Sequence, residues 1–193
     1  MKNQFITQGV CITLLFLVLC SCGPKEMTPA QSVQEFYQAF DNGNFERIKP
    51  LLADTLTLTE GAHNTNYSKT MYYAYFAWDS VFKPSYKVID IQEKEDYLLA
   101  KVSSASERYA FLKNNPFVCT YKITMAYGKI RQIEVLEYHD ANFSVWQQQL
   151  DSLVPWIKKT HPELDGFIHD QSLTGAQNYR KAIALYQKRN RSN

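Results

Sequence analysis

The hydrophobic residues between positions 28 and 40 recur at the spacing of an amphipathic helix, which places them on one helical face. The positions that share this spacing are Val33, Phe36, Tyr37 and Phe40. The preceding segment, Thr-Pro-Ala-Gln at 28–31, offers a capping threonine, a proline for the first turn and a glutamine that can close a capping box. The pattern predicts a first helix from Thr28 to the Asp-Asn-Gly-Asn segment at 41–44.

Two further helices are predicted before residue 84. A short one begins near Phe45, and Pro50 is expected to distort its end. Residues 56–59 then alternate like a short strand, and the polar stretch 60–66 is typical of a loop. The third helix spans 68–82 and is apolar over more than half of its circumference. We therefore expect it to be covered on two sides or to face a cavity.

Between residues 86 and 138 the apolar residues change to the period of two that is typical of strands. The predicted strands are 86–92, 97–106, 117–127 and 129–138. Links of hairpin length between them indicate an antiparallel, curled sheet. Three helices followed by such a sheet predict an α+β cone, in which the N-terminal helices lie across the concave face of the curved antiparallel sheet.

The chain beyond this sheet returns to helical spacing. One helix is predicted around Trp146 to Ile157, and a last helix from about Thr174 carries basic residues at its end, where they complement the helix dipole. We expect residues 140–193 to form a helical extension packed on a domain of residues 28–139.

The order of these elements resembles that of the nuclear transport factor 2-like superfamily, including SnoaL-like domains. The resemblance covers roughly residues 28–139. It rests on the order and spacing of Asp-Asn-Gly-Asn-Phe at 41–45, Leu-Leu-Ala-Asp at 51–54 and Tyr-Gly-Lys-Ile at 127–130. A cystatin-like sheet and a lipocalin-type barrel disagree with the number of helices. The resemblance implies the cone described above and also allows a homodimer through the outer sheet face.

Residues 1–21 have the pattern of a secretory signal, with Lys2 ahead of a short apolar stretch. This stretch is shorter than the roughly 20 residues that a membrane-spanning helix needs. Its end, Leu-Cys-Ser-Cys at 19–22, resembles the bacterial lipobox, which implies cleavage before Cys22 and lipidation of the Cys22 thiol. Several acyl chains on one residue give a stable anchor. The alternative is ordinary secretion with cleavage near Ser21.

The lipobox makes the membrane, reached through the lipid anchor, an expected partner of this protein. Residues 22–27 then form a short tether, and we expect localisation to the bacterial cell envelope, at the outer membrane. Three short segments, at 54–56, 79–81 and 151–153, also resemble the O-glycosylation sequon of envelope proteins from Bacteroidetes. They agree with a lipoprotein of that lineage.

Composition and charge exclude several classes of protein. The 193 residues are 45% hydrophobic and 14% aromatic, with 21 basic and 19 acidic side chains. Such a balance excludes a nucleic-acid-binding polycation and a low-complexity disordered chain. Of the four cysteines, only Cys119 lies beyond residue 22, so a disulfide framework is excluded, and its strand-like surroundings favour a small buried hydrophobe.

The sequence contains no motif for a metal, a phosphate loop or a catalytic triad, so we expect no cofactor, no metal site and no assigned catalytic residue. Its histidines are scattered over the predicted loops and the extension. The family resemblance implies that an enzyme of this kind would hold an acid or a base inside the cone, and the available counterparts are Asp79, Glu134, Glu137 and His139. We interpret these side chains as solvated surface charges, Asp79 because it lies near the end of its helix.

The aromatic residues give the better functional signal, because a pocket rich in tyrosine binds a flat or amphipathic ligand while its hydroxyls set the orientation. The candidate ligand-binding residues are Tyr37, Phe40, Tyr72, Phe76, Trp78, Tyr109, Tyr121 and Tyr138. The same rings could simply fill the cone.

Two functional hypotheses follow from these rings. The first is a non-catalytic binding module for a small apolar ligand or an envelope protein. The second is a dehydratase- or isomerase-like enzyme with one buried acid-base residue. A buried, solvent-reachable carboxylate or histidine beside a tyrosine would favour the enzyme, and an all-aromatic or closed interior would favour binding.

Overall fold

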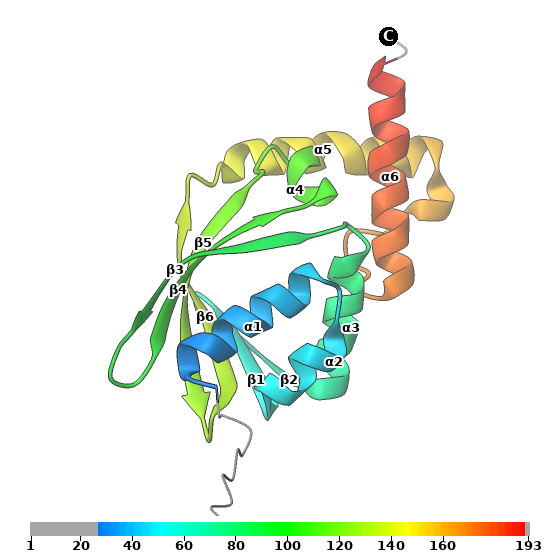
Figure 1. The fold of residues 1–193 in the computed structure, drawn as a ribbon. Coiled ribbons are helices and arrows are strands. Elements are labelled where there is room, and N and C mark those ends of the chain that lie inside the picture. Colours follow the sequence, from blue (N-terminus) through cyan, green and yellow to red (C-terminus); the bar gives the residue numbers. More distant parts are fainter. Residues whose placement is uncertain (1–26, 192–193) are drawn as a thin grey trace, which may run out of the picture.

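The computed structural model describes the chain from residue 27 to residue 191, with side chains to residue 189. The expected signal segment and Cys22 lie outside the described residues. Figure 1 shows a curved sheet with helix α1 (Pro29–Asp41) lying across its concave side and two long helices gathered beyond one end of the sheet.

Helix α1 begins where its capping residues predict. The Gln31 N–H donates to Thr28 Oγ1 at 3.2 Å and the Thr28 N–H donates to Gln31 Oε1 at 2.9 Å, which completes the capping box. The predicted apolar stripe is buried, with Val33 fully excluded from solvent. The helix ends before Gly43, whose positive φ of 63° suits a residue without a side chain.

The next two helices also follow the sequence pattern. Helix α2 (Phe45–Ile48) passes into a 3-10 turn, η1 (Lys49–Leu51), so the distortion expected at Pro50 is confirmed. Helix α3 (Lys69–Ser80) buries Tyr72, Phe76 and Asp79. Its opposite edge is open, since Met71 and Tyr73 are each 53% exposed. The expectation that this helix is covered on two sides or faces a cavity is confirmed, because its remaining surface contacts both the sheet and the C-terminal extension.

The sheet has six strands in the order β2-β1-β6-β5-β4-β3. Strands β3 (Ser85–Glu93), β4 (Leu98–Ala105), β5 (Phe117–Ala126) and β6 (Lys129–His139) pair antiparallel in chain order, so this part of the prediction is confirmed. Strand β1 (Leu52–Glu60) lies parallel to β6, which makes the whole sheet mixed rather than purely antiparallel.

The polar stretch predicted as a loop is in fact an edge strand, β2 (His63–Ser68), which pairs antiparallel with β1. Its polar side chains are explained by this position, because an edge strand is half solvated and polar side chains there discourage pairing with other chains. They also bond across the pair, since Thr57 Oγ1 donates to Asn66 Oδ1 at 2.8 Å and Thr59 Oγ1 donates to Asn64 Oδ1 at 2.7 Å.

A short helix, α4 (Glu107–Phe111), follows β4 and was not predicted. Its five residues are too few to show a helical period, and its only local signal is Ser106, whose Oγ accepts the Tyr109 N–H at 3.0 Å. The next loop is tied to the extension, because the Asn142 N–H donates to Asn114 Oδ1 at 2.6 Å.

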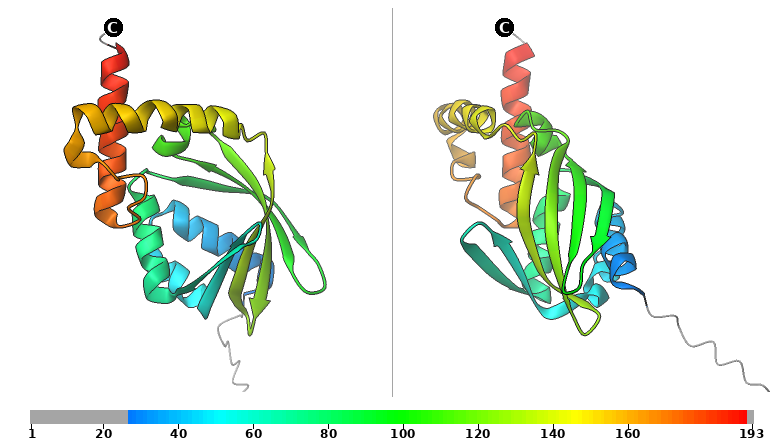
Figure 2. Two further views of the ribbon diagram at one scale, coloured as in Figure 1. Left: turned by 180° about the vertical axis from the view of Figure 1, so that it is seen from behind. Right: turned by 90° about the vertical axis from the view of Figure 1, so that its left-hand side faces the viewer.

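The extension consists of α5 (Phe143–Thr160), the 3-10 turn η2 (Pro162–Leu164) and α6 (Leu173–Arg191). Figure 2 shows α5 crossing α6 near one end of the sheet. These helices build a second hydrophobic core around Phe82 and Phe111, separate from the core that α1, α2 and α3 form with the sheet. Helix α6 also contacts α3 and α4 directly.

Within residues 27–191, no helix combines the length and the hydrophobicity that crossing a bilayer requires.

Candidate functional site

A cavity of about 470 Å³ lies between the concave face of the sheet and helices α1, α3, α4 and α5. Thirteen aromatic residues line it, so its wall is dominated by rings. They are Phe36, Tyr37, Phe40, Tyr67, Tyr72, Tyr75, Tyr86, Tyr109, Phe117, Tyr121, Tyr138, Phe143 and Trp146. The remaining lining residues are Leu58, Thr59, Glu60, His63, Thr65, Ser104, Arg108, Ile133 and Val135.

Six of the eight predicted ligand-binding residues line this cavity. They are Tyr37, Phe40, Tyr72, Tyr109, Tyr121 and Tyr138. Tyr37 and Tyr72 are only 6% and 3% exposed, so they form deep parts of the wall. Burial raises the pKa of both phenols, which keeps them neutral hydrogen-bonding groups.

The other two predicted residues, Phe76 and Trp78, do not line the cavity. Phe76 packs inside the core against Phe40 and Phe45, with ring centroids 5.0 and 5.4 Å away. Trp78 faces the extension, where its ring meets Phe82 and its Nε1–H donates to the Asp170 carbonyl at 3.2 Å. Both residues have structural roles, because the apolar side of α3 is shared between the cone and the extension.

Several lining residues were missed by the sequence analysis. Tyr86 is in phase with Val88 along β3, and both pack against the first core, so the period of two could have placed it inside. Tyr75 is one helical turn from Tyr72 and stacks on it at 5.6 Å. Arg108, in contrast, belongs to a helix too short to have a pattern, and no sequence signal marks it.

Asp79 is buried, which contradicts its interpretation as a surface charge. It is 5% exposed, and Tyr86 Oη donates to Asp79 Oδ2 at 2.6 Å. The helical spacing explains this position, because Asp79 follows Tyr72 and Phe76 at i+7 and i+3 and so shares their buried face. Burial raises the pKa of the Asp79 carboxyl, while the Tyr86 hydrogen bond and the nearby Arg108 charge act in the opposite direction.

Tyr86 connects this carboxylate to the cavity. Its ring lines the cavity, its hydroxyl is engaged by Asp79, and its backbone N–H donates to Asp41 Oδ1 at 2.8 Å. Burial and the Asp79 charge raise the pKa of Tyr86 well above its ordinary value. A ligand in the cavity would therefore contact the protonated Tyr86. Asp79 is not part of the lining and acts only through its hydrogen bond with Tyr86.

Arg108 introduces a positive charge into this aromatic wall. Its guanidinium carbon lies 4.8 Å from the ring centroid of Tyr109 and 5.5 Å from that of Trp146. Burial by itself lowers the pKa of the guanidinium, but Tyr109 and Asp79 raise it, and the net shift is upward. The group is therefore a permanent cation.

Two other polar lining residues, Glu60 and His63, come from the exposed β1–β2 hairpin. The Tyr138 hydroxyl donates to Glu60, and this contact raises the pKa of Tyr138 together with burial. This end of the cavity is therefore polar and solvated, while the interior is aromatic.

The remaining acid-base candidates lie outside the cavity lining. Glu137 has a side chain that is 64% exposed, Glu134 faces Lys122 at 3.5 Å, and His139 Nε2 lies 2.8 Å from Thr120 Oγ1. The interpretation of Glu137 as an outward, solvated charge is confirmed. Among the described residues, no group of three or more histidine, cysteine, aspartate or glutamate side chains could hold a metal ion.

Cys119 is 1% exposed on β5, so its interpretation as a small buried hydrophobe is confirmed. Burial raises the pKa of its thiol, which makes the thiolate scarce.

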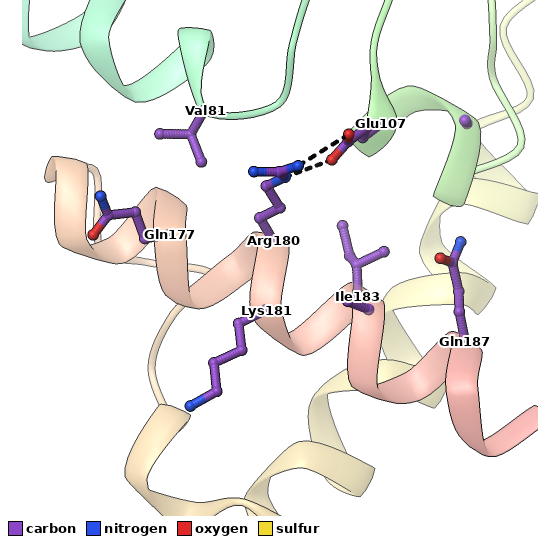
Figure 3. A pocket seen from close by; sticks show the side chains of 9 residues that line it. Val81, Glu107, Gln177, Arg180, Lys181, Ile183 and Gln187 are labelled. Carbon is purple, nitrogen blue, oxygen red and sulfur yellow. Dashed lines mark hydrogen bonds and ion pairs between the residues drawn. The ribbon is translucent and has the colours of Figure 1, made fainter.

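A second hollow of similar volume lies between α4 and α6 (Figure 3). Figure 3 shows Arg180 reaching across it to Glu107, and the guanidinium binds both carboxylate oxygens at 2.6 and 3.2 Å. Lys83 Nζ adds a third contact to Glu107 at 2.9 Å. The charged groups of this hollow pair with one another, and these ion pairs connect the extension to the domain. The aromatic cavity is therefore the better candidate for a functional site.

Solved structures share this arrangement of a helix-filled, curved sheet. They include Bal32a from a soil-derived mobile gene cassette, with a TM-score of 0.50 and 13% identity over 62% of this chain and 94% of that one. An NTF2-like protein of unknown function from Cytophaga hutchinsonii has a TM-score of 0.49 and 15% identity over 61% of this chain and 95% of that one. Another from Burkholderia xenovorans has a TM-score of 0.45 and 14% identity, covering 59% and 84%.

Two of these three solved structures are described as NTF2-like. No protein-family model matches this chain, and no curated protein matches it. At these identities the likeness concerns the fold alone, and the chemistry of the site has to be argued from the residues of this chain.

Proposed function

We propose that this protein is a non-catalytic binding module, which holds a small ligand with a flat or hydrocarbon body inside the aromatic cavity of its NTF2-like domain. The observation that carries the proposal is the wall itself, in which thirteen rings surround a cavity of about 470 Å³. Protein interiors are otherwise close-packed, and an apolar void lowers stability. A pocket of this size with a few polar groups is typical of small-molecule sites.

We further propose that a lipid on Cys22 holds this module at the bacterial envelope, at the outer membrane. The support is the lipobox-like segment at 19–22 and the short distance along the chain from Cys22 to Thr28, where α1 is capped. The cavity would then lie close to the membrane surface, where apolar ligands concentrate.

Native mass spectrometry of the protein purified from the cells that make it tests the binding proposal. We expect a co-purifying small molecule. The variant Val135→Trp places a large side chain in the cavity and should lose that molecule, while Leu136→Trp, which changes the adjacent and 49% exposed residue, should keep it. Equal retention by both variants, or no bound molecule in the unchanged protein, would contradict the proposal.

A dehydratase- or isomerase-like enzyme is the second candidate, and the Asp79–Tyr86 pair is the observation that favours it. A buried carboxyl whose pKa is raised holds its proton more readily than an exposed one, which suits a general acid or base. We prefer binding because the cavity exposes Tyr86 and not the carboxylate. The enzyme would be favoured if the unchanged protein converts the co-purified molecule and the Asp79→Asn variant binds this molecule but does not convert it.

A further inference from the structure

The guanidinium of Arg108 lacks the acceptor that a buried donor normally has. Among the described residues, its Nε is the one buried side-chain nitrogen or oxygen atom without a hydrogen-bond partner. Buried donors are nearly always paired, because leaving one unpaired costs about 1–3 kcal/mol, and more when the group is charged. Because Arg108 also lines the cavity, a ligand held there could supply an acceptor to its guanidinium.

The rings around Arg108 stabilise its charge but cannot supply that acceptor. Besides Tyr109 and Trp146, the rings of Trp78 and Phe82 lie 5.2 and 5.7 Å from the guanidinium carbon. Aromatic rings attract a guanidinium chiefly over their faces. The N–H groups of a guanidinium lie in its own plane, in a fork that matches a carboxylate. The aromatic surroundings thus supply no acceptor for the Arg108 Nε–H.

Three acidic side chains are candidates to pair with Arg108, and each is engaged elsewhere. Asp79 accepts the Tyr86 hydroxyl, and Glu107, the preceding residue in the chain, is turned toward Arg180 and Lys83. Glu60, at the solvated end of the cavity, accepts the Tyr138 hydroxyl. Within the described residues, Arg108 forms no ion pair with any carboxylate.

We propose that Arg108 binds the carboxylate of a small organic acid, whose flat or hydrocarbon body lies among the tyrosine rings of the cavity. This inference rests on the proposed binding function and names the chemical class of its ligand. The carboxylate accepts N–H groups of the Arg108 guanidinium, and the apolar body occupies the cavity beside Tyr37, Tyr72 and Tyr121.

Two compounds of nearly the same shape, one anionic and one neutral, test the inference. They are biphenyl-4-carboxylate and biphenyl-4-carboxamide. Calorimetric titration of the unchanged protein should show that the carboxylate binds about tenfold or more tightly, as expected for a charge-assisted hydrogen bond in a desolvated site. In Arg108→Met the carboxylate should lose this advantage, and Arg108→Lys should keep part of it. Arg180→Met, which removes the arginine of the other hollow, should leave the preference unchanged.

A measurement on the unchanged protein avoids any dependence on the folding of the variants. The ¹⁵N–¹H resonance of Arg108 Nε should move on addition of the carboxylate and stay in place with the carboxamide. Equal affinities, or a preference that survives in a folded Arg108→Met, would overturn the inference while leaving the binding function intact. If neither compound binds and Val135→Trp retains as much co-purifying molecule as Leu136→Trp, the binding function fails and the inference fails with it.

Discussion

Asp79 shows at the scale of single residues how a charged side chain comes to lie inside this fold. Its position at i+7 from Tyr72 puts it on the buried face of α3, and its carboxylate accepts a hydrogen bond from the Tyr86 hydroxyl. A carboxylate in such surroundings is costly to keep ionised, and its pKa is accordingly raised. The stability of the fold should therefore depend on pH through the ionisation of Asp79.

Asp79→Asn should remove a pH-dependent loss of stability. Since the folded-state pKa of Asp79 is raised above the ordinary value of 3.8, its contribution to stability is fully present below that value and is lost as pH rises through the folded-state pKa. The variant should therefore gain stability relative to the unchanged protein as pH increases from about 4. Urea unfolding of both proteins at several pH values measures this, and a stability difference that stays constant with pH would contradict it.

At the scale of secondary structure elements, a close contact fixes the start of α6 to the loop that precedes it. Gly175 in its first turn is buried against the preceding loop, and a Cβ at this position would fall on the Asp170 carbonyl oxygen. That same oxygen accepts the Trp78 indole N–H, so the loop is fixed to α3 at this point. Trp78 thus holds the extension in place, which is the reason for its absence from the cavity.

Gly175→Ala should destabilise the protein by about 1–3 kcal/mol, because the backbone of the Asp170 loop has to move. Helix propensity alone would give the opposite sign, since alanine is favoured over glycine by about 1 kcal/mol in a helix. Thr174→Ala, at the adjacent exposed position, is the control and should change stability by less than about 0.5 kcal/mol. Thermal unfolding of both variants compares them, and a more stable Gly175→Ala would contradict this packing.

The elements differ in how well the sequence predicts them. Helix α1 and the four strands from β3 to β6 repeat their period often enough to be found from the chain alone. Helix α4 is too short for a period to show, and β2 is polar because it is an edge. The parallel pairing of β1 with β6 joins segments far apart in the sequence, and no local pattern encodes it.

At the scale of the whole molecule, the site is formed both by the predicted cone and by helices that follow β4 and β6. The tyrosines of α1 and α3 belong to the predicted cone, whereas Arg108 comes from α4 and Trp146 from the first turns of α5. The aromatic character of the cavity could be predicted because most of its rings belong to the cone. Its positive charge could not, because Arg108 lies on a helix too short to show a pattern. Helices α4 and α5 therefore complete the wall that the cone begins.

Cys22→Ser should release the protein from the membrane if the lipid anchor is correct. Without the thiol there is no site for the diacylglyceryl group, and the protein should fail to incorporate radiolabelled palmitate. Cys119→Ser is the matched control, because that thiol is buried in β5, and its labelling should be unchanged. Equal labelling of the Cys22→Ser variant and the unchanged protein would contradict the anchor.

The central claim is that the cone holds a ligand among its tyrosine rings. A crystal structure of the protein purified from the cells that make it, without solvent extraction, tests this most directly. The account predicts continuous non-protein density between Tyr37, Tyr72 and Tyr121, with an acidic group at Arg108, and the same region filled by the new side chain in Val135→Trp. A cavity closed by repacked rings, or one that contains only water, would contradict it.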